Sequence, residues 1–241
     1  VDIQNVLDSD IQMVLDHFAP HPASRAQDER ALGLTSLWAA RARERFLKTN
    51  RRNCQFGIIQ GGLHGDLRER SLRELAAMDF DGYAIGGLSV GESLADFRRI
   101  LAPLAPELPA AKPRYLMGSG TPEDILFAVE HGMDMFDCVL PSRNARNGTL
   151  FTSHGKVRIK NEMYKSDPRP LDEDCRCYTC LNFPRAYLRH LFMSREILAS
   201  ILHTIHNIHF YLDFMAKIRY AIHSQKFSEF KENFLALYKG E

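Results

Sequence analysis

Short apolar runs recur along the first 140 residues, and each ends in small or polar residues. Five of these runs fit strands, at residues 11–16, 56–61, 83–88, 114–118 and 133–139. Between them, apolar residues three and four positions apart predict helices over 31–47, 67–78, 93–101 and 122–132. Strands that alternate with helices predict an α/β fold whose parallel sheet has right-handed crossovers.

Glycines follow three of the predicted strands, in Gly61-Gly62, Gly86-Gly87 and Gly118-Ser119-Gly120. Glycine lets a ligand approach the backbone closely. In a barrel of parallel strands, the active site lies at the carboxyl ends of the strands. We therefore expect a functional site at this edge of the sheet.

The number of strands leaves two architectures open. Five strands are enough for an open doubly wound sheet, but Gly118-Ser119-Gly120 lacks the third glycine of a dinucleotide-binding loop. An eight-stranded barrel needs three more strands, and nothing after Pro141 resembles strand-helix alternation. The barrel interpretation therefore requires that its amino-terminal part is missing from this chain.

The charge of the chain is nearly balanced overall but uneven along it. The 241 residues carry a formal charge of +1, and no window of about 18 residues lacks a charge or a histidine, so no membrane-spanning helix is expected. Between residues 143 and 170, however, seven basic residues accompany two acidic ones. This stretch fits phosphate contacts with nucleic acid or, equally well, a solvated loop.

Three of the five cysteines fall within six residues, as Cys175, Cys177 and Cys180. This spacing favours a structural zinc ion that needs one further ligand, usually histidine, over a cluster of reduced thiols. The chain from 196 onward is predicted to be helical, with apolar residues at 197, 201, 205, 208, 212 and 215. His206 lies just beside this apolar stripe, His209 on its edge and His203 toward solvent, so either of the first two suits the fourth ligand.

Several motifs together resemble tRNA-guanine transglycosylases, also called queuine tRNA-ribosyltransferases, over nearly the whole chain. They are FGIIQGG at 56–62, GYAIGGLSVGE at 82–92, RYLMG at 114–118, MFDCVLPSRNARNG at 135–148, and the cysteine cluster with its later His-Asn. The resemblance implies a TIM barrel with an inserted or appended zinc-binding subdomain and carboxyl-terminal helices. It also implies a cytoplasmic, homodimeric enzyme of queuosine biosynthesis that replaces guanine at the tRNA wobble position with a 7-deazaguanine.

The resemblance assigns roles to individual residues of this chain. It makes Asp137 the nucleophile of a covalent aspartyl-ribose intermediate, which suits base exchange because it keeps water from capturing the sugar. The base is expected to bind at Asp16, Gln60, Gly87, Leu88, Met117 and Gly118. Glu92 matches a residue that supports the nearby peptide, and Arg143 and Arg146 match contacts to the tRNA. The zinc ligands are expected to be Cys175, Cys177, Cys180 and His206.

Two departures from the family pattern shape the prediction. His17-Phe18 follows Asp16 where bacterial members usually have Glu-Cys, which leaves the preferred 7-deazaguanine open. An Asp-Ser-Gly-Gly motif, which carries the family's additional aspartate, has no counterpart.

We therefore predict a carboxyl-terminal portion of the enzyme, inactive or weakly active by itself, with a partial barrel over 1–150. Residues 151–241 are expected to hold the basic segment, the zinc subdomain and the helices. The alternative is a noncatalytic tRNA-binding or dimerisation subunit. Asp137 favours the enzyme, because such a subunit has no need of a nucleophile.

Overall fold

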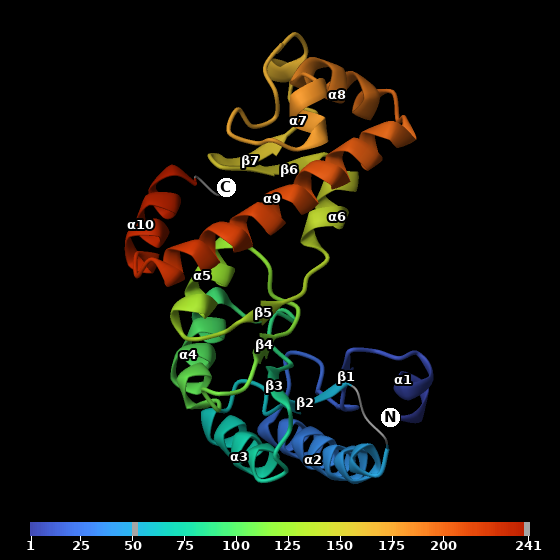
Figure 1. Cartoon of the computed structure of the whole chain (residues 1–241), viewed down its shortest axis with the longest axis vertical. Helices are drawn as coiled ribbons and strands as arrows, with labels where there is room; N and C mark the ends of the chain where they lie inside the picture. Colours follow the sequence, from blue (N-terminus) through green and yellow to red (C-terminus); the bar gives the residue numbers. More distant parts are fainter. Residues whose placement is uncertain (50–52, 239–241) are drawn as a thin grey trace. The chain divides into compact units, whose positions relative to one another are not determined.

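The computed structural model describes residues 1–49 and 53–238. The chain divides into two compact units, Val1–Cys138 and Val139–Glu241, and each is described by itself (Figure 1). Among the described residues, no helix combines the length and apolar character needed to cross a lipid bilayer.

The first unit is built on a sheet of five parallel strands. They are β1 (Ile11–Met13), β2 (Cys54–Ile59), β3 (Gly82–Ile85), β4 (Arg114–Leu116) and β5 (Met135–Phe136). Their order in space is their order in sequence, because each strand adds to the same edge of the sheet. A doubly wound sheet instead reverses its order at a switch point. The sheet is therefore part of a TIM barrel, as predicted.

Helices connect these strands and follow the outside of their curved row (Figure 1). The connecting helices are α2 (Arg25–Leu47), α3 (Gly65–Ala76), α4 (Leu94–Leu104), the short 3-10 helix η1 (Ala105–Glu107) and α5 (Pro122–Glu130), while α1 (Asp2–Val6) precedes β1. Helix α2 begins six residues before the predicted start at 31, because Ser24 and Gln27 form a capping box in front of it. Strands β2 and β3 are buried almost throughout, as expected when helices and the barrel interior cover both faces.

A fully buried arginine of α3 forms hydrogen bonds that link the carboxyl ends of β2 and β3. The Arg68 guanidinium donates hydrogen bonds to the carbonyl oxygens of Ile59, Gly62, Gly86 and Gly87. Burial lowers the pKa of Arg68 to about 10, while the charges of Asp28 and Glu92 oppose that shift. The side chain stays charged at neutral pH and holds the two glycine turns in place.

The second unit joins a hairpin and several helices. Its elements are α6 (Leu140–Arg146), β6 (Thr149–Thr152), β7 (Gly155–Arg158), the 3-10 helix η2 (Glu162–Tyr164), α7 (Tyr178–Asn182), α8 (Arg185–Met193), α9 (Ile197–His223) and α10 (Phe227–Leu237). The long helix α9 packs against α6, α7, α8, α10 and β6 (Figure 1). The basic stretch is therefore an ordered hairpin beside this helix rather than a loop throughout.

Helix α9 is present as predicted, but it buries a different face. The predicted apolar stripe is exposed, with Ile197 at 79% and Leu212 at 66%, whereas His203, His206 and Asn207 are fully buried. Asn207 donates to the carbonyl oxygens of Pro141 and Thr149 and accepts from the amide of Phe151. These polar contacts fix the rotation of the helix.

The expected exposure of His203 is therefore wrong. Its Nδ1 lies 3.2 Å from the carbonyl oxygen of Ala145, and its Nε2 has no partner among the described residues. Burial lowers the pKa of His203 to about 4, and the hydrogen bond to Ala145 offsets this only in part.

Replacing Arg68 should destabilise the first unit strongly. Arg68→Met leaves several buried carbonyl oxygens without donors, so we expect the free energy of unfolding to fall by roughly 3 kcal/mol or more. The control Arg70→Met removes an exposed pair with Glu74 on the same helix and should cost less than about 1 kcal/mol. Urea denaturation followed by fluorescence of Trp38, the single tryptophan, measures both. Equal losses would contradict the assigned role.

Burial of His203 predicts a pH-dependent stability. Its folded pKa lies below the usual value of about 6.5, so the unfolded chain binds the proton more readily. As pH falls from about 6.5 to 4, the free energy of unfolding should drop by up to about 1.4 kcal/mol per pH unit from this group. His203→Asn should make the free energy of unfolding depend less on pH than in wild type. His206 is present in both proteins, so its titration does not account for the difference. Parallel curves from denaturation at each pH would refute this origin.

Candidate functional site

Asp137 lies just beyond the carboxyl end of β5, and its carboxylate is exposed. Its Oδ1 accepts hydrogen bonds from the hydroxyl of Tyr115, at 2.6 Å, and from the amide of Gly118, at 2.9 Å. Both donors come from β4 and the residues after it, which pair with β5. Burial and the Asp137 carboxylate raise the pKa of Tyr115, so its hydroxyl stays protonated and keeps donating. The carboxylate is thereby oriented, with Oδ2 left available.

Asp16 and Gln60 meet because β1 and β2 are parallel neighbours. The side-chain amide of Gln60 donates to Oδ2 of Asp16 over 2.6 Å. The backbone amide of Gln60 donates to Ser71 Oγ on α3, which anchors this residue behind the strand end. Gln60 is buried and Asp16 is partly exposed. Together they offer a polar edge that can both donate and accept hydrogen bonds.

The glycine turn after β3 packs directly on Gln60. Gly87 has a φ of +62°, and a Cβ there would lie 2.4 Å from Gln60 Oε1. Only glycine permits this approach. Leu88 is buried in the core, and Met117 packs partly buried against that core.

Gly118 occupies the corresponding turn after β4, with a φ of +74°. A Cβ at this position would meet nothing nearer than the Leu88 carbonyl oxygen at 4.0 Å. The surroundings of Gly118 are therefore open enough for a ligand to reach the backbone. The six residues predicted to bind a base all come from the strand ends of this sheet.

A cavity of about 410 Å³ opens beside Gly87. It is lined by Val90 and Glu92 together with other polar residues that include Asp28, His64 and Arg99. The Glu92 carboxylate accepts from the backbone amides of Ser89 and Val90. Glu92 thus supports the peptide after Gly87, as the resemblance implies.

The structure adds Tyr115 and Arg68 to the predicted residues. Tyr115 belongs to the RYLMG segment, and its place on the strand beside Asp137 was the available signal. Arg68 gave no signal, because an arginine in a charged amphipathic helix looks like a surface residue. Of the two residues that depart from the family pattern after Asp16, Phe18 is half exposed, and the His17 amide donates a hydrogen bond to Thr35 Oγ1.

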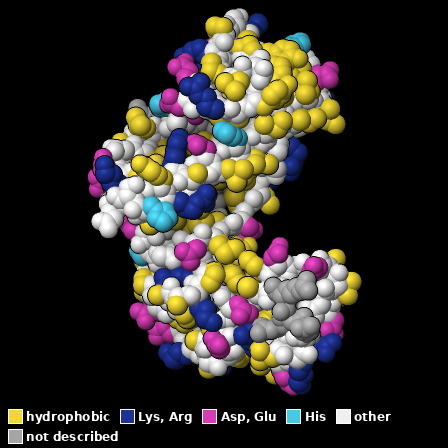
Figure 2. Space-filling model, viewed as in Figure 1, with side chains coloured by type: hydrophobic (Ala, Val, Ile, Leu, Met, Phe, Trp, Pro, Cys, Tyr) yellow, Lys and Arg dark blue, Asp and Glu magenta, His cyan; other side chains and the backbone are white. Residues whose placement is uncertain are grey.

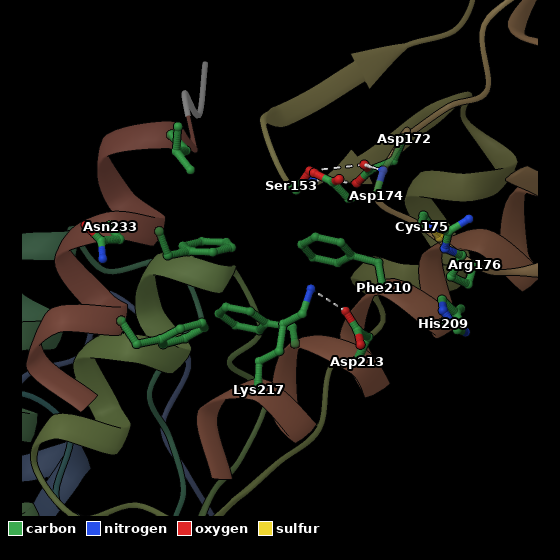
Figure 3. A pocket seen from close by; sticks show the side chains of 14 residues that line it. Ser153, Asp172, Asp174, Cys175, Arg176, His209, Phe210, Asp213, Lys217 and Asn233 are labelled. Carbon is green, nitrogen blue, oxygen red and sulfur yellow. Dashed lines mark hydrogen bonds and ion pairs between the residues drawn. The ribbon is translucent and has the colours of Figure 1, made fainter. Parts of the chain in front are cut away.

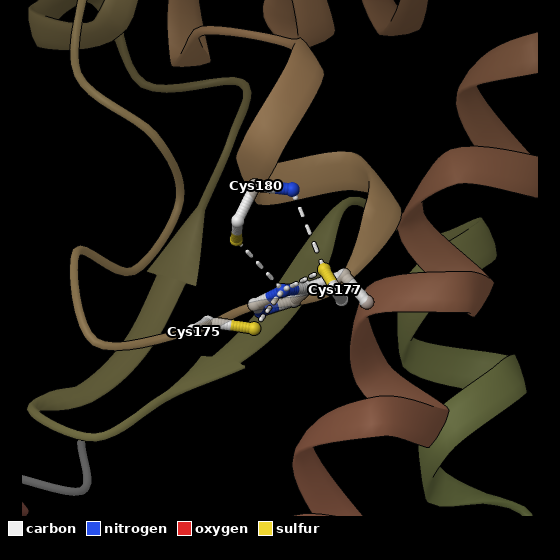
Figure 4. Close-up of side chains that lie close together, drawn as sticks. Cys175, Cys177 and Cys180 are labelled. Atoms are coloured by element: carbon white, nitrogen blue, oxygen red, sulfur yellow. Dashed lines mark hydrogen bonds between the residues drawn. The ribbon is translucent and has the colours of Figure 1, made fainter.

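Cys175, Cys177, Cys180 and His206 converge in the second unit (Figure 4). Nδ1 of His206 lies 3.8, 3.5 and 3.3 Å from the three sulfur atoms, in that order. A tetrahedral zinc ion with bonds of about 2.0–2.3 Å would place its donors about 3.5–3.8 Å apart. Nε2 of His206 lies 2.7 Å from the Phe151 carbonyl oxygen, a bond that leaves Nδ1 free to bind a metal.

The charges of this cluster also suit a cation. Hydrogen bonds from Cys175 and Cys180 lower the pKa of the Cys177 thiol despite its burial. Burial lowers the pKa of His206, but Cys175 and Cys177 outweigh that effect and raise it to about 9. The cluster therefore attracts positive charge to its centre. The donor set fits a metal ion that prefers thiolate and imidazole ligands.

The other candidate ligand, His209, lies outside this cluster. It lines a cavity of about 570 Å³ between α9, α10 and the loop that carries Cys175 (Figure 3). Phe210 points into this cavity beside Asp213 and Lys217, which pair over 2.8 Å. Because Cys175 also lines the cavity, this cavity reaches the edge of the group formed by the three cysteines and His206.

Arg143 and Arg146 lie on α6 with exposed side chains, in a different unit from Asp137. No hydrogen bond or ion pair engages either guanidinium within the described part of the chain. They are free to meet an external anion.

Comparison with known proteins identifies relatives along the whole chain. A family model described as queuine tRNA-ribosyltransferase matches residues 1–240. Curated relatives of that name include those from Thermodesulfovibrio yellowstonii, 54% identical over 98% of this chain, and Nitratidesulfovibrio vulgaris, 53% identical over 100% of it. These alignments cover 61% and 64% of the relatives, so the chain spans about three fifths of their length. The chain belongs to the queuine tRNA-ribosyltransferase family.

Proposed function

We propose that the protein containing this chain exchanges guanine in the anticodon loop of tRNA for a 7-deazaguanine, as a step of queuosine biosynthesis. The main observation behind this proposal is the exposed carboxylate of Asp137 at a strand end. Its Oδ1 accepts hydrogen bonds from Tyr115 and Gly118. A carboxylate held in this way at the carboxyl edge of a barrel sheet is suited to nucleophilic attack. The names of the relatives support the same activity.

In the proposed reaction, Oδ2 of Asp137 attacks C1′ of the target nucleotide. The glycosidic bond breaks, and its electron pair leaves with the guanine base, which takes up a proton. The incoming base then attacks C1′ through its ring nitrogen, loses the proton there and releases the carboxylate. Hydrogen bonds to Oδ1 limit rotation of the side chain, so less orientational entropy is lost on the way to the transition state.

The base would bind against the polar edge formed by Asp16 and Gln60. Purine recognition needs donors and acceptors in fixed positions. The Gln60–Asp16 hydrogen bond and the close contact of Gly87 with Gln60 provide such rigidity. Backbone groups at Leu88 and Gly118 would complete the pocket, with Met117 against the ring.

Arg143 and Arg146 would contact the phosphates that flank the exchanged nucleotide. Their unpaired guanidinium groups suit phosphate oxygens. Flipping out a target base from an unpaired loop costs less free energy than flipping one out of a duplex, because no base pair has to be broken. Activity on tRNA implies a cytoplasmic protein.

The metal ion in this proposal is structural zinc. Cys175, Cys177, Cys180 and His206 would fill all four positions of a tetrahedral ion and leave none for water or substrate. Bound there, the ion would tie the cysteine loop to α9 and stabilise the second unit.

Homodimer formation is part of the same proposal. Figure 2 shows hydrophobic side chains gathered over α8 and the start of α9. Exposed residues there include Tyr187, Met193, Ile197, Leu198 and Ile201. An apolar surface of this kind is typical of protein interfaces.

The nucleophile is tested with the full-length protein, tRNA and a 7-deazaguanine on a denaturing gel. We expect a covalent protein–tRNA adduct with wild type and none with Asp137→Asn, whose base-exchange rate should fall roughly 10³-fold or more. The matched control Asp134→Asn alters an exposed aspartate that binds the Arg114 amide, and it should keep the adduct. Absence of any adduct despite tRNA binding would favour the noncatalytic subunit.

The metal assignment is tested by elemental analysis. Wild type should contain about one zinc ion per chain, and Cys177→Ser should lose it together with stability of the second unit. Cys54→Ser changes an exposed cysteine outside the cluster and should retain the metal. Metal-free protein that remains folded would refute the assignment.

A further inference from the structure

Both hydrogen bonds to the Asp137 carboxylate end on the same oxygen atom. Oδ1 accepts from the Tyr115 hydroxyl at 2.6 Å and from the Gly118 amide at 2.9 Å, while Oδ2 has no hydrogen-bond partner among the described residues. In the proposed base exchange, Oδ2 is therefore the atom that bonds to the sugar. Oδ1 becomes the carbonyl oxygen of the resulting ester and keeps both donors.

The sheet fixes the position of the Tyr115 hydroxyl. Tyr115 pairs with Met135 in the register of β4 and β5, and Asp137 follows Met135 by two residues. Because side chains alternate along a strand, Tyr115 and Asp137 project from the same face. The Tyr115 ring packs partly buried against the core of the first unit. Within the part of the chain that the structure describes, the hydroxyl donates to Asp137 alone.

The charge of the acceptor decides how strong this hydrogen bond is. A distance of 2.6 Å is typical of a hydroxyl that donates to an ionised carboxylate, and such a bond is roughly twice as strong as one between neutral groups. Burial and the Asp137 carboxylate raise the pKa of Tyr115, which keeps its hydroxyl a donor at neutral pH. An ester carbonyl carries no net charge and accepts a weaker bond. Tyr115 therefore stabilises free Asp137 more than it stabilises Asp137 bonded to the sugar.

We propose that Tyr115 promotes release of the sugar from Asp137 and so keeps the covalent intermediate short-lived. When the incoming base attacks C1′ through its ring nitrogen, it loses the proton of that nitrogen to solvent. The C1′–Oδ2 bond breaks, and its electron pair returns to the carboxylate. The returning charge spreads onto Oδ1, where Tyr115 and Gly118 already donate. Tyr115 is a positioning residue in this scheme, because it contacts Asp137 rather than the sugar.

The two half-reactions should respond differently to loss of the hydroxyl. Without this donor the free carboxylate is less stable, so its attack on C1′ is not slowed by the loss of charge stabilisation. The departing carboxylate is also less stable, so the intermediate decays more slowly. If Tyr115 only held Asp137 in place, its loss would slow both steps. The inference rests on the proposed function, because it requires the covalent intermediate.

The test uses Tyr115→Phe in the full-length protein, a change that keeps the packed ring and removes the hydroxyl. Attack is measured as adduct formation after rapid mixing of excess enzyme with labelled tRNA. Release is measured as decay of the adduct after a chase with saturating guanine. We expect decay to slow about 10-fold and formation to slow by no more than about 2-fold, so that the adduct accumulates.

Tyr83→Phe is the matched control. It removes a hydroxyl from β3, the other strand that pairs with β4, and Tyr83 is not a hydrogen-bond partner of Asp137. Both of its rates should equal those of wild type. The thermal midpoint of Tyr115→Phe should stay close to that of wild type, because its ring remains packed against the core.

Equal slowing of formation and decay in Tyr115→Phe would overturn the proposal and assign Tyr115 a purely structural role. Unchanged decay would overturn it as well. Either result, together with a wild-type adduct that Asp137→Asn abolishes, would retain base exchange and refute only the role of Tyr115. Absence of the wild-type adduct would refute base exchange and this inference with it.

Discussion

The buried guanidinium of Arg68 is the contact on which the candidate site depends. Backbone carbonyls at the ends of two strands point toward a fully buried guanidinium, and each buried carbonyl needs a hydrogen-bond donor. One planar group with several donors satisfies Ile59, Gly62, Gly86 and Gly87 at once. Asp28 and Glu92 lower the cost of burying its charge. The glycine turns can then remain open toward solvent while their positions stay fixed.

The rest of the site follows from parallel pairing along this edge. Parallel neighbours bring Asp16 to Gln60 and Tyr115 to Asp137, although each pair is separated by many residues in sequence. Their side chains are held by neighbouring strands rather than by a mobile loop. Such preorganisation would serve the proposed base exchange, in which the sugar would meet a carboxylate already in place.

The second unit achieves order by a different route. Its polar groups are buried between the β6–β7 hairpin, the cysteine loop and α9. Each of these groups finds its hydrogen-bond partner on another of these elements or on α6. His206 faces three sulfur atoms and the Phe151 carbonyl, while Asn207 satisfies backbone groups of α6 and β6. These requirements outweigh the burial of Ile197, Ile201, Ile205 and Ile208, which remain exposed on α9.

The sequence by itself determined the strand-helix alternation, the glycine turns and the cysteine spacing, because each depends on neighbours only a few residues apart. It could not determine the buried face of α9. Periodicity identifies a helix with apolar residues, but the face that turns inward depends on partners such as Phe151 and Cys180, which are distant in sequence. For the same reason only the tertiary structure revealed the roles of Arg68 and Tyr115, since these consist of contacts between separate elements: α3 with the ends of β2 and β3, and β4 with the end of β5.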